Sequence, residues 1–378
     1  MTLFFLIVFG IYFALVIALL TGLYISTEQR PSSRETIPHR MLSVIIPIRN
    51  EATSISNLLE SLSKQSYPSG HFEIRLVNDH SEDDSVTIVN QFCLSHLNVE
   101  LLYLPENLAG KKQALCLGIE NSTGEIIVTT DADCVVSASW LESINQAFTP
   151  KTMMCIGGVR VNGNGSLFSQ LQSMEFSSLI GSAAATLAFG YPTMCNGANL
   201  AFRKQAFKKV NGYADNFDIA SGDDEFLMRK INSAFPGSIV FLNDSSAIVT
   251  TVPHQSLKGF IQQRIRWAGK WKFNRSVPTI LLALFVFIFQ ASFLILIILT
   301  AVKEIDNKFG LLLIGGKLLL EFLFLYQVGL FLKTKWHWPS FILLQFLYPI
   351  YVLSIGLLAQ SKSYVWKERK VAHKKRGV

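Results

Sequence analysis

Four long apolar stretches, one at the N-terminus and three near the C-terminus, constrain this chain most strongly. Leu3 to Ile25 carries no charged side chain and is long enough to span a bilayer as a helix. The C-terminal stretches are residues 278–301, 311–332 and 339–358. We therefore expect a transmembrane helix at residues 1–26, membrane helices within residues 276–360, and a folded domain of mixed polarity between them.

Basic residues flank these stretches and indicate which side of the membrane each segment occupies. The first stretch lacks the basic start of a cleaved signal peptide, so we interpret it as an anchor. Arg30, Arg34, His39 and Arg40 follow it, which by the positive-inside rule places the middle domain in the cytoplasm. The net charge of +7 comes largely from such flanks and from the basic tail at residues 361–378, a pattern that fits anionic lipid and argues against nucleic acid as a partner.

The C-terminal stretches raise a conflict over topology. Three full spans that start from the cytoplasm would leave the basic tail outside, whereas the positive-inside rule expects it inside. Either one stretch does not cross or the tail breaks the rule. Residues 311–332 are the suspect, because they contain Gly315, Gly316, Lys317 and Glu321. Lys317 and Glu321 are one helical turn apart, and such an intramembrane pair is either a functional site or a packing and topology device.

Residues 40–253 alternate between buried-strand patterns and helical patterns. Apolar, β-branched runs occur at residues 42–47, 72–77, 99–104 and 125–130, and helical spacing of apolar residues follows the first three. This alternation predicts an α/β domain with a mostly parallel sheet. The polar residues that follow successive strands would then meet at one edge, which is where such sheets bind ligands.

The strand at residues 125–130 ends in two carboxylates, Asp131 and Asp133. Hard oxygen ligands of this kind suit Mg²⁺ or Mn²⁺, which proteins usually share with substrate phosphates. An Asp-x-Asp is also common in a solvated turn, so the pair alone is weak evidence. Four more polar residues are expected at the same edge: Arg49, Glu51, Asp79 and Lys111.

Three of these four residues also have a plain structural interpretation. Asp79 could cap the next helix, Glu51 could be a charge at a helix N-terminus, and Lys111 could begin a solvated helix. A lysine beside a helix N-terminus equally favours phosphate. Their convergence at one edge favours a binding site over three separate local roles.

Six segments resemble, in order, the motifs of family 2 glycosyltransferases. They include an Asp-x-Asp at residues 131–133, an acidic pair in the sequence Gly222-Asp223-Asp224 and a Gln-x-x-Arg-Trp motif at residues 263–267. The others are residues 77–83, 110–115 and 195–203. The resemblance implies a GT-A fold, a Rossmann-like nucleotide-diphospho-sugar transferase domain, over about residues 42 to 275. The tail sequence Trp366-Lys367-Glu368-Arg369 also resembles a basic tail of membrane members of this family, which favours the cytoplasm.

The resemblance implies a role for each matching residue. Asp79 would contact the nucleotide base, and Asp131 the ribose or sugar. Asp133, with Asp131 beside it, would hold the divalent metal. Asp224 would be the general base. The remaining residues would line the nucleotide-sugar pocket (Pro47, Arg49, Glu51 and Lys111) or close over diphosphate and acceptor (Gln263, Arg266 and Trp267).

The chain departs from the family pattern at three positions. Asn78 replaces a usual Asp and His80 a usual Gly, while the base-contacting Asp79 is retained. Asp223 replaces a usual Glu, which leaves open whether Asp223 or Asp224 is the base.

Residues 254–275 form a separate basic and aromatic segment. Arg264, Arg266, Lys270 and Lys272 are interspersed with apolar and aromatic side chains, which predicts a helix in the headgroup plane. Trp267 could serve a sugar or lipid acceptor, or could anchor the helix at the interface.

The sequence therefore predicts an integral protein of the plasma membrane (the inner membrane in a bacterium). The expected activity is metal-dependent, inverting transfer of a sugar from a nucleotide donor, by family default a UDP-sugar, to a lipid, lipid-linked or saccharide acceptor. Two alternatives remain: a processive polysaccharide synthase of the same family, and a catalytically inactive membrane scaffold. The scaffold reading expects the loss of Asp133, Asp224 or the Gln-x-x-Arg-Trp motif, and all are retained.

Overall fold

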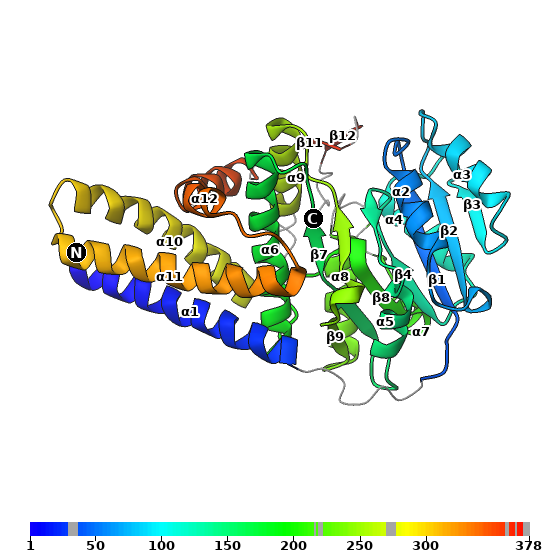
Figure 1. The fold of residues 1–378 in the computed structure, drawn as a ribbon, viewed down its shortest axis with the longest axis horizontal. Helices are drawn as coiled ribbons and strands as arrows, with labels where there is room; N and C mark the ends of the chain where they lie inside the picture. The colour runs from blue at the N-terminus through cyan, green and yellow to red at the C-terminus, as the bar shows by residue number, and fades with distance from the viewer. Residues whose placement is uncertain are drawn as a thin grey trace, which may run out of the picture.

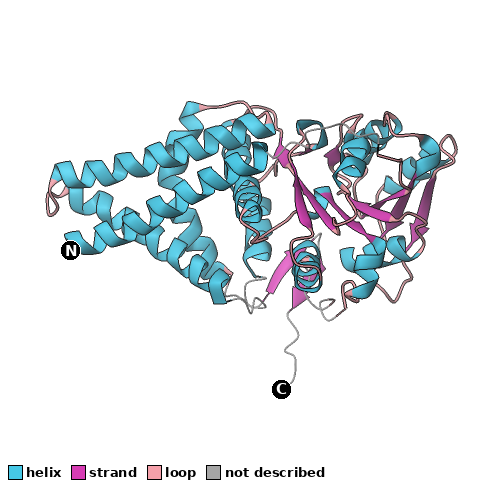
Figure 2. Ribbon diagram, turned by 90° about the horizontal axis from the view of Figure 1, so that it is seen from below, coloured by secondary structure: helices cyan, strands magenta, loops and turns pink. Residues whose placement is uncertain are grey.

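The protein consists of an α-helical bundle beside an α/β domain (Figure 1). The computed structural model describes residues 1–28, 37–214, 217, 222–269 and 277–359, together with the backbone of residues 363–366 and 369–372. The N-terminus lies at the end of the bundle that is remote from the α/β domain (Figure 1). Figure 2 shows the same division, with strands confined to one half of the molecule.

The α/β domain contains a seven-stranded sheet of order β3-β2-β1-β4-β8-β6-β9. Strands β1 (Leu42–Ile48), β2 (Phe72–Asn78), β3 (Val99–Tyr103) and β4 (Ile126–Thr129) are parallel. Strand β8 (Leu200–Arg203) is antiparallel to both neighbours, β4 and β6 (Met154–Gly157), and β9 (Ile239–Leu242) is parallel to β6. The predicted α/β fold with a mostly parallel sheet is confirmed.

Helices cover both faces of this sheet because its strands are apolar and buried on both sides. They are α2 (Ile55–Ser63), α3 (Ser85–Cys93), α4 (Lys111–Glu120), α5 (Trp140–Ala147), α7 (Lys204–Lys209) and α8 (Asp223–Ala234). A small second sheet of order β5-β10-β7 joins Cys134–Val135, Val249–Thr251 and Val159–Val161. Single 3₁₀ turns occupy Ser69–His71, Gly197–Asn199 and Ser245–Ala247.

Four helices are long and apolar enough to cross a membrane. They are α1 (Thr2–Glu28), α10 (Val277–Ala301), α11 (Asn307–Leu332) and α12 (Trp338–Leu358). Helix α11 runs without interruption through Gly315 and Gly316. The long apolar helices expected at both ends of the chain are therefore present.

Two further helices, α6 (Leu167–Ala188) and α9 (Leu257–Gly269), lie between the bundle and the sheet (Figure 1). Helix α6 packs against α1, α11 and α12, and also against β7 and β9. Gly22 of α1 approaches α6 so closely that a Cβ there would overlap the Ala185 carbonyl group. The bundle and the domain are thus joined by direct packing rather than by a linker alone.

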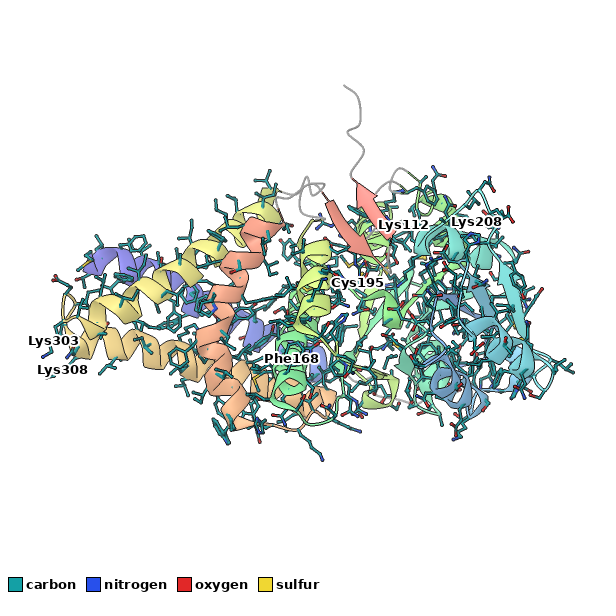
Figure 3. All side chains as sticks on the ribbon, turned by 90° about the horizontal axis from the view of Figure 1, so that it is seen from above. Lys112, Phe168, Cys195, Lys208, Lys303 and Lys308 are labelled. Carbon is teal, nitrogen blue, oxygen red and sulfur yellow. The ribbon has the colours of Figure 1, made fainter. Side chains whose placement is uncertain are left out.

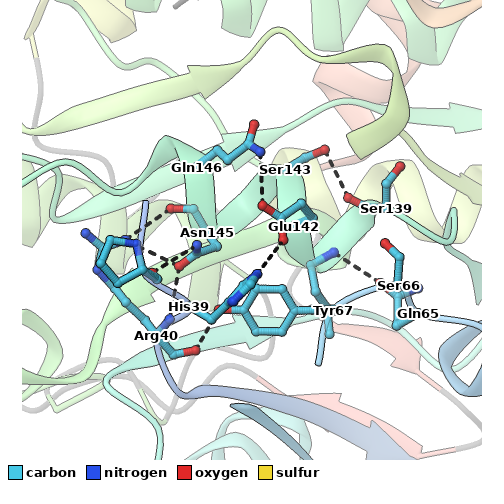
Figure 4. A network of polar contacts seen from close by, with 12 residues as sticks. His39, Arg40, Gln65, Ser66, Tyr67, Ser139, Glu142, Ser143, Asn145 and Gln146 are labelled. Carbon is cyan, nitrogen blue, oxygen red and sulfur yellow. Dashed lines mark hydrogen bonds and ion pairs between the residues drawn. The ribbon is translucent and has the colours of Figure 1, made fainter. Parts of the chain in front are cut away.

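The chain that enters the domain is fastened to α5 by the polar network drawn in Figure 4. The His39 ring lies 3.3 Å from the Glu142 carboxylate, and Arg40 donates to the backbone carbonyl of Asn145. Tyr67 donates to the Arg40 carbonyl at 2.7 Å. Burial raises the pKa of Tyr67 to about 12, so this phenol remains a neutral donor. His39 and Arg40, expected as membrane-flanking charges, therefore also anchor the domain.

Candidate active site

Asp79 lies at the end of β2 in a turn that is braced from two sides. Its Oδ2 accepts a hydrogen bond from the Gly110 amide at 3.0 Å, and the side chain is 2% exposed. Arg49 donates from Nη1 to the backbone carbonyls of Asp79 at 2.7 Å and His80 at 2.9 Å. Asp79 is thereby fixed beside the start of α4, at the carboxyl ends of the parallel strands.

His80 adopts a left-handed backbone conformation, with φ of 56°. Non-glycine residues adopt this conformation uncommonly, whereas glycine, which the family resemblance leads one to expect here, adopts it without steric cost. The His80 ring nitrogen Nε2 lies 2.9 Å from the Leu108 carbonyl oxygen. This contact ties the turn after β2 to the loop before α4.

Lys111 is the centre of a charged cluster at the same edge. Its Nζ lies 2.5 Å from Asp131 Oδ1 and 4.0 Å from Asp223 Oδ2. Burial by itself would lower the pKa of Lys111, but the carboxylates of Asp131, Asp223 and Asp224 outweigh it and hold the pKa above its usual value. Lys111 follows Gly110, whose φ of 103° turns the chain into α4. The structure thus brings residues from three separate motifs together around one ammonium group.

Asp223 and Asp224 form the first turn of α8, after Gly222 in a left-handed conformation. Asp224 Oδ2 accepts from the Gly197 amide at 3.0 Å, and Oδ1 accepts from the Glu225 amide at 2.7 Å. Gly197 begins the 3₁₀ turn before β8. The acidic pair at residues 223–224 is therefore joined to the segment at residues 195–203 by a direct hydrogen bond.

Asp131 and Asp133 follow β4 and are both partly exposed. No three His, Cys, Asp or Glu side chains converge in the described part of the chain in a way that would hold a metal unaided. Two carboxylates fit Mg²⁺ or Mn²⁺ when substrate phosphates complete the coordination, and such ions are usually bound in that way. The residues present therefore fit a metal that arrives with a diphosphate.

Pro47 and Glu51 lie at the end of β1. Pro47 is the partly buried residue of that strand and pairs in register with Val77 of β2. Glu51 Oε2 accepts from the Ser54 hydroxyl at 2.9 Å, immediately before α2. Glu51 thus takes part in the helix-start arrangement that the sequence offered as its alternative role.

Helix α9 carries Gln263, Arg266 and Trp267, all partly exposed. Arg264, in contrast, is 5% exposed and forms a two-point ion pair with Glu175 of α6, from Nε to Oε1 at 3.1 Å and from Nη2 to Oε2 at 2.6 Å. Its guanidinium carbon lies 4.3 Å from the centre of the Trp267 ring and 4.6 Å from that of Phe260. Arg264 is one of the basic residues on which the expectation of a helix in the headgroup plane depends, but its charge is paired inside the protein.

Glu175 was not among the predicted site residues, since nothing in its local sequence marks it. It lies in the middle of α6 and also accepts from the Tyr351 hydroxyl of α12 at 3.0 Å. The Gln-x-x-Arg-Trp helix is thus tied to α6 and α12 by one buried carboxylate. Lys270, Trp271, Lys272 and Phe273, which were expected to continue this helix, lie outside the described residues.

The amino-acid sequence of this chain is similar to one protein family and to several known proteins. Residues 43–210 match the family described as Glycosyl transferase family 2. Glycosyltransferase AglE of Haloferax volcanii is 27% identical over 220 residues, which cover 55% of this chain and 66% of AglE. A poly-β-1,6-N-acetyl-D-glucosamine synthase of Staphylococcus epidermidis is 28% identical over 231 residues, 60% of this chain and 53% of the synthase. The chain thus spans about half to two thirds of the length of these relatives.

One solved structure resembles almost the whole chain. It is the mannosyltransferase PcManGT from Pyrobaculum calidifontis in complex with GDP-Man and Mn²⁺. The TM-score is 0.57 at 17% identity, and the match covers 95% of this chain and 97% of that one. At this identity the likeness concerns the fold, and its coverage includes the long apolar helices as well as the sheet. The α/β domain therefore has a GT-A-like fold, and the chain matches the Glycosyl transferase family 2 model over residues 43–210.

Proposed function

We propose that this chain is an integral-membrane glycosyltransferase that moves one sugar from a nucleotide-diphosphate donor to a lipid, lipid-linked or saccharide acceptor, with inversion at the anomeric carbon. The observation that carries the proposal is the cluster around Lys111, which joins Asp131 to the acidic pair at residues 223–224. It lies at the carboxyl edge of a parallel sheet, where α/β proteins bind ligands.

The donor half of the site consists of Asp79, Lys111 and Asp131. Asp79 would accept hydrogen bonds from the nucleotide base, with Arg49 holding its turn in place. Lys111 would exchange part of its pairing with Asp131 for the donor diphosphate, at a helix N-terminus that favours anions. UDP-sugars are the first donors to test, and GDP-sugars the second.

Charge develops on the departing diphosphate during transfer and must be balanced. A divalent metal held by Asp133 and Asp131 would supply Lewis-acid stabilisation of that charge when bound. Arg266 on α9, with Gln263 and Trp267, would close over the diphosphate and acceptor from the membrane side. Positive groups placed where charge develops are commonly the largest contribution to such a rate enhancement.

The acceptor hydroxyl needs a base on the side of the sugar opposite the diphosphate. We propose that Asp224 takes this proton, with Asp223 as the alternative. The hydrogen bond from Gly197 to Asp224 supports this choice, since it fixes the carboxylate against the segment expected to face the acceptor. Attack and departure on opposite faces give a single displacement with inversion.

The α/β domain is proposed to face the cytoplasm. The basic residues after α1 support this orientation through the positive-inside rule, although Arg30 and Arg34 lie outside the described residues. The adjacent Arg40 is fastened to α5. In this orientation α9 would present the site to lipid-linked acceptors at the inner membrane surface.

A processive synthase of the same family is the second candidate. The similarity to a poly-β-1,6-N-acetyl-D-glucosamine synthase supports it. The described residues provide four candidate membrane helices, few for a monomer to enclose a polymer channel, so we favour single transfer. Product length separates the two: one added sugar or a ladder.

The proposal is tested by titrating the purified full-length protein with UDP- and GDP-sugars, with and without Mn²⁺. We expect one donor to bind, and Mn²⁺ to strengthen binding at least tenfold. Asp133→Asn should abolish this metal dependence. Asp84→Asn is the matched control, because Asp84 is an exposed carboxylate that makes no side-chain cap hydrogen bond. Metal-dependent binding by Asp133→Asn would refute the metal assignment, and a wild-type protein that binds none of these donors would refute the donor class.

A further inference from the structure

Helix α12 begins on the side of the bundle where the α/β domain lies. The preceding helix, α11, ends against the domain, since the Phe331 ring is 5.8 Å from the Phe241 ring of β9. After a short turn, Ser340 in the first turn of α12 donates from Oγ to Gln170 of α6 at 3.0 Å. Helix α6 itself packs against the domain. The starting point of α12 is therefore at the domain side.

Helix α12 also ends on that side. Tyr351, two thirds of the way along it, donates to Glu175 of α6, and its ring lies 5.9 Å from Phe260 of α9. The chain then continues to β11 (Ser363–Trp366), which lies beside α9 and pairs with β12 (Arg369–Ala372). A helix whose two ends both meet elements at the domain side has not reached the opposite face of the bundle.

The orientation of α12 agrees with these contacts. In Figure 1, α1, α10 and α11 run along the long axis of the molecule, whereas α12 is seen almost end-on. Figure 3, turned by 90°, shows α12 crossing the bundle near the α/β domain. The same view places Lys303, in the connection between α10 and α11, and Lys308, in the first turn of α11, at the remote end.

The two faces of α12 differ in what they contact. Ser340, Phe341, Gln345 and Pro349 are buried, and Gln345 Oε1 accepts from Lys317 of α11 at 2.6 Å. The other face is apolar and open, with exposed fractions from 49% to 67%. Its members, spaced mainly one turn apart, are Ile342, Phe346, Ile350 and Leu357.

We propose that α12 does not cross the membrane but lies in the plane of the leaflet nearest the α/β domain, with acyl chains of that leaflet covering its open face. Helix α12 packs against α10, on which Leu281 and Leu284 are likewise exposed. Helix α12 has no charged side chain, so its open face suits the acyl chains of a leaflet rather than the lipid headgroups. The protein then has three spans, α1, α10 and α11.

This arrangement removes the conflict between span number and charge. With three spans, the basic tail at residues 361–378 returns to the same side as the α/β domain, as the positive-inside rule expects. Lys317 and Glu321 no longer mark a stretch that fails to cross. They pair at 2.8 Å within α11, and Gln345 of α12 satisfies Lys317 further. The intramembrane pair thereby docks α12 onto a spanning helix.

The first test is topological and independent of sugar transfer. Each of two reporters, green fluorescent protein and alkaline phosphatase, is placed at each of two sites in separate full-length chains. One site follows residue 378 and the other follows Lys303. We expect the two sites to report opposite sides of the membrane. A crossing α12 would place both sites on the same side, which would overturn the proposal.

The second test measures depth along α12. A nitroxide is attached at position 342, 346, 350 or 357 in liposomes, in a background with Cys93, Cys116 and Cys195 replaced by serine. An in-plane helix gives similar oxygen-to-nickel accessibility ratios at all four positions. A spanning helix gives a maximum in the middle and a fall toward both ends. Low oxygen access together with label–label broadening would show that a second copy of the chain covers the open face. Both this result and the profile of a spanning helix would contradict the proposal.

Discussion

The ion pair between Glu175 and Arg264 should contribute strongly to stability because both partners are withdrawn from water. Each side chain is 5% exposed, and the two carboxylate oxygens face two guanidinium nitrogens. Replacing one partner leaves the other charge buried without its counter-ion, which typically costs about 3–5 kcal/mol. Arg264 would also lose the support that keeps its guanidinium against Trp267.

The magnitude follows from the size of the chain. With a melting-temperature change of about 2 °C for each kcal/mol in a protein of this size, Glu175→Met should lower Tm by about 6–10 °C. Arg264→Met should have a similar effect. The double variant should recover much of this loss, because two apolar side chains of similar volume can replace a buried pair at little net cost.

The assay is thermal unfolding of the detergent-solubilised protein for the wild type, both single variants and the double variant. Glu60→Gln is the control, since the Glu60–Lys64 pair is exposed and its loss should leave Tm unchanged. Single variants within 2 °C of wild type would refute the reasoning. So would a double variant in which the two losses simply add, because that result would show no coupling between the partners.

Two further predictions concern the site, and a third concerns the dependence of stability on pH. Asp224→Asn should keep donor affinity and lower transfer by about 10²–10⁴-fold; if Asp223→Asn does this instead, the base is the preceding residue. Lys111→Met should weaken donor binding at least tenfold, since the diphosphate would meet the paired carboxylates without a cation, and unchanged affinity by titration would contradict this role. Burial lowers the pKa of His254, with the fields of Arg264 and Arg266 acting in the same direction against a Gln263 hydrogen bond. As the pH falls below about 6.5, His254 becomes protonated in the unfolded chain more readily than in the native state, so the native state loses stability. Between pH 7.5 and pH 5.5, the Tm should therefore fall less in His254→Gln than in the wild type. An equal fall in both proteins would exclude this contribution.

The sheet and the edge at which its polar residues lie could be predicted, because local sequence patterns indicate both. The strands are continuous apolar runs, and the polar residues that follow them can only gather where parallel strands end. Asp79, Lys111 and Asp131 therefore lie close together as the sequence predicts. His80 departs from the expected glycine even though its left-handed backbone is the conformation that favours glycine.

Helix α6 was not predicted, since its sequence gives no single apolar face. It is rich in serine and alanine and is covered by the bundle on one side and by the domain on the other. A helix enclosed in this way shows no amphipathic period. Its one buried carboxylate, Glu175, meets a partner 89 positions away, and no local pattern indicates such a pairing.

Arg264 shows that a pattern of basic residues does not indicate which of them is buried in the folded protein. A basic residue on an aromatic-rich helix beside a membrane is expected to face headgroups. Only the tertiary packing of α6, α9 and α12 shows that this one is enclosed. The orientation of α12 is of the same kind, because length and hydropathy are equal for a crossing and an in-plane helix.

The central claim, transfer of a sugar from a nucleotide donor, is tested most directly by donor hydrolysis. The purified full-length protein is incubated with a panel of UDP- and GDP-sugars, with and without Mn²⁺, and released nucleotide is measured. We expect Mn²⁺-dependent release from one donor, and its loss in Asp133→Asn but not in Asp84→Asn. Equal release by Asp133→Asn and the wild type, or no release and no donor binding across the panel, would contradict the account.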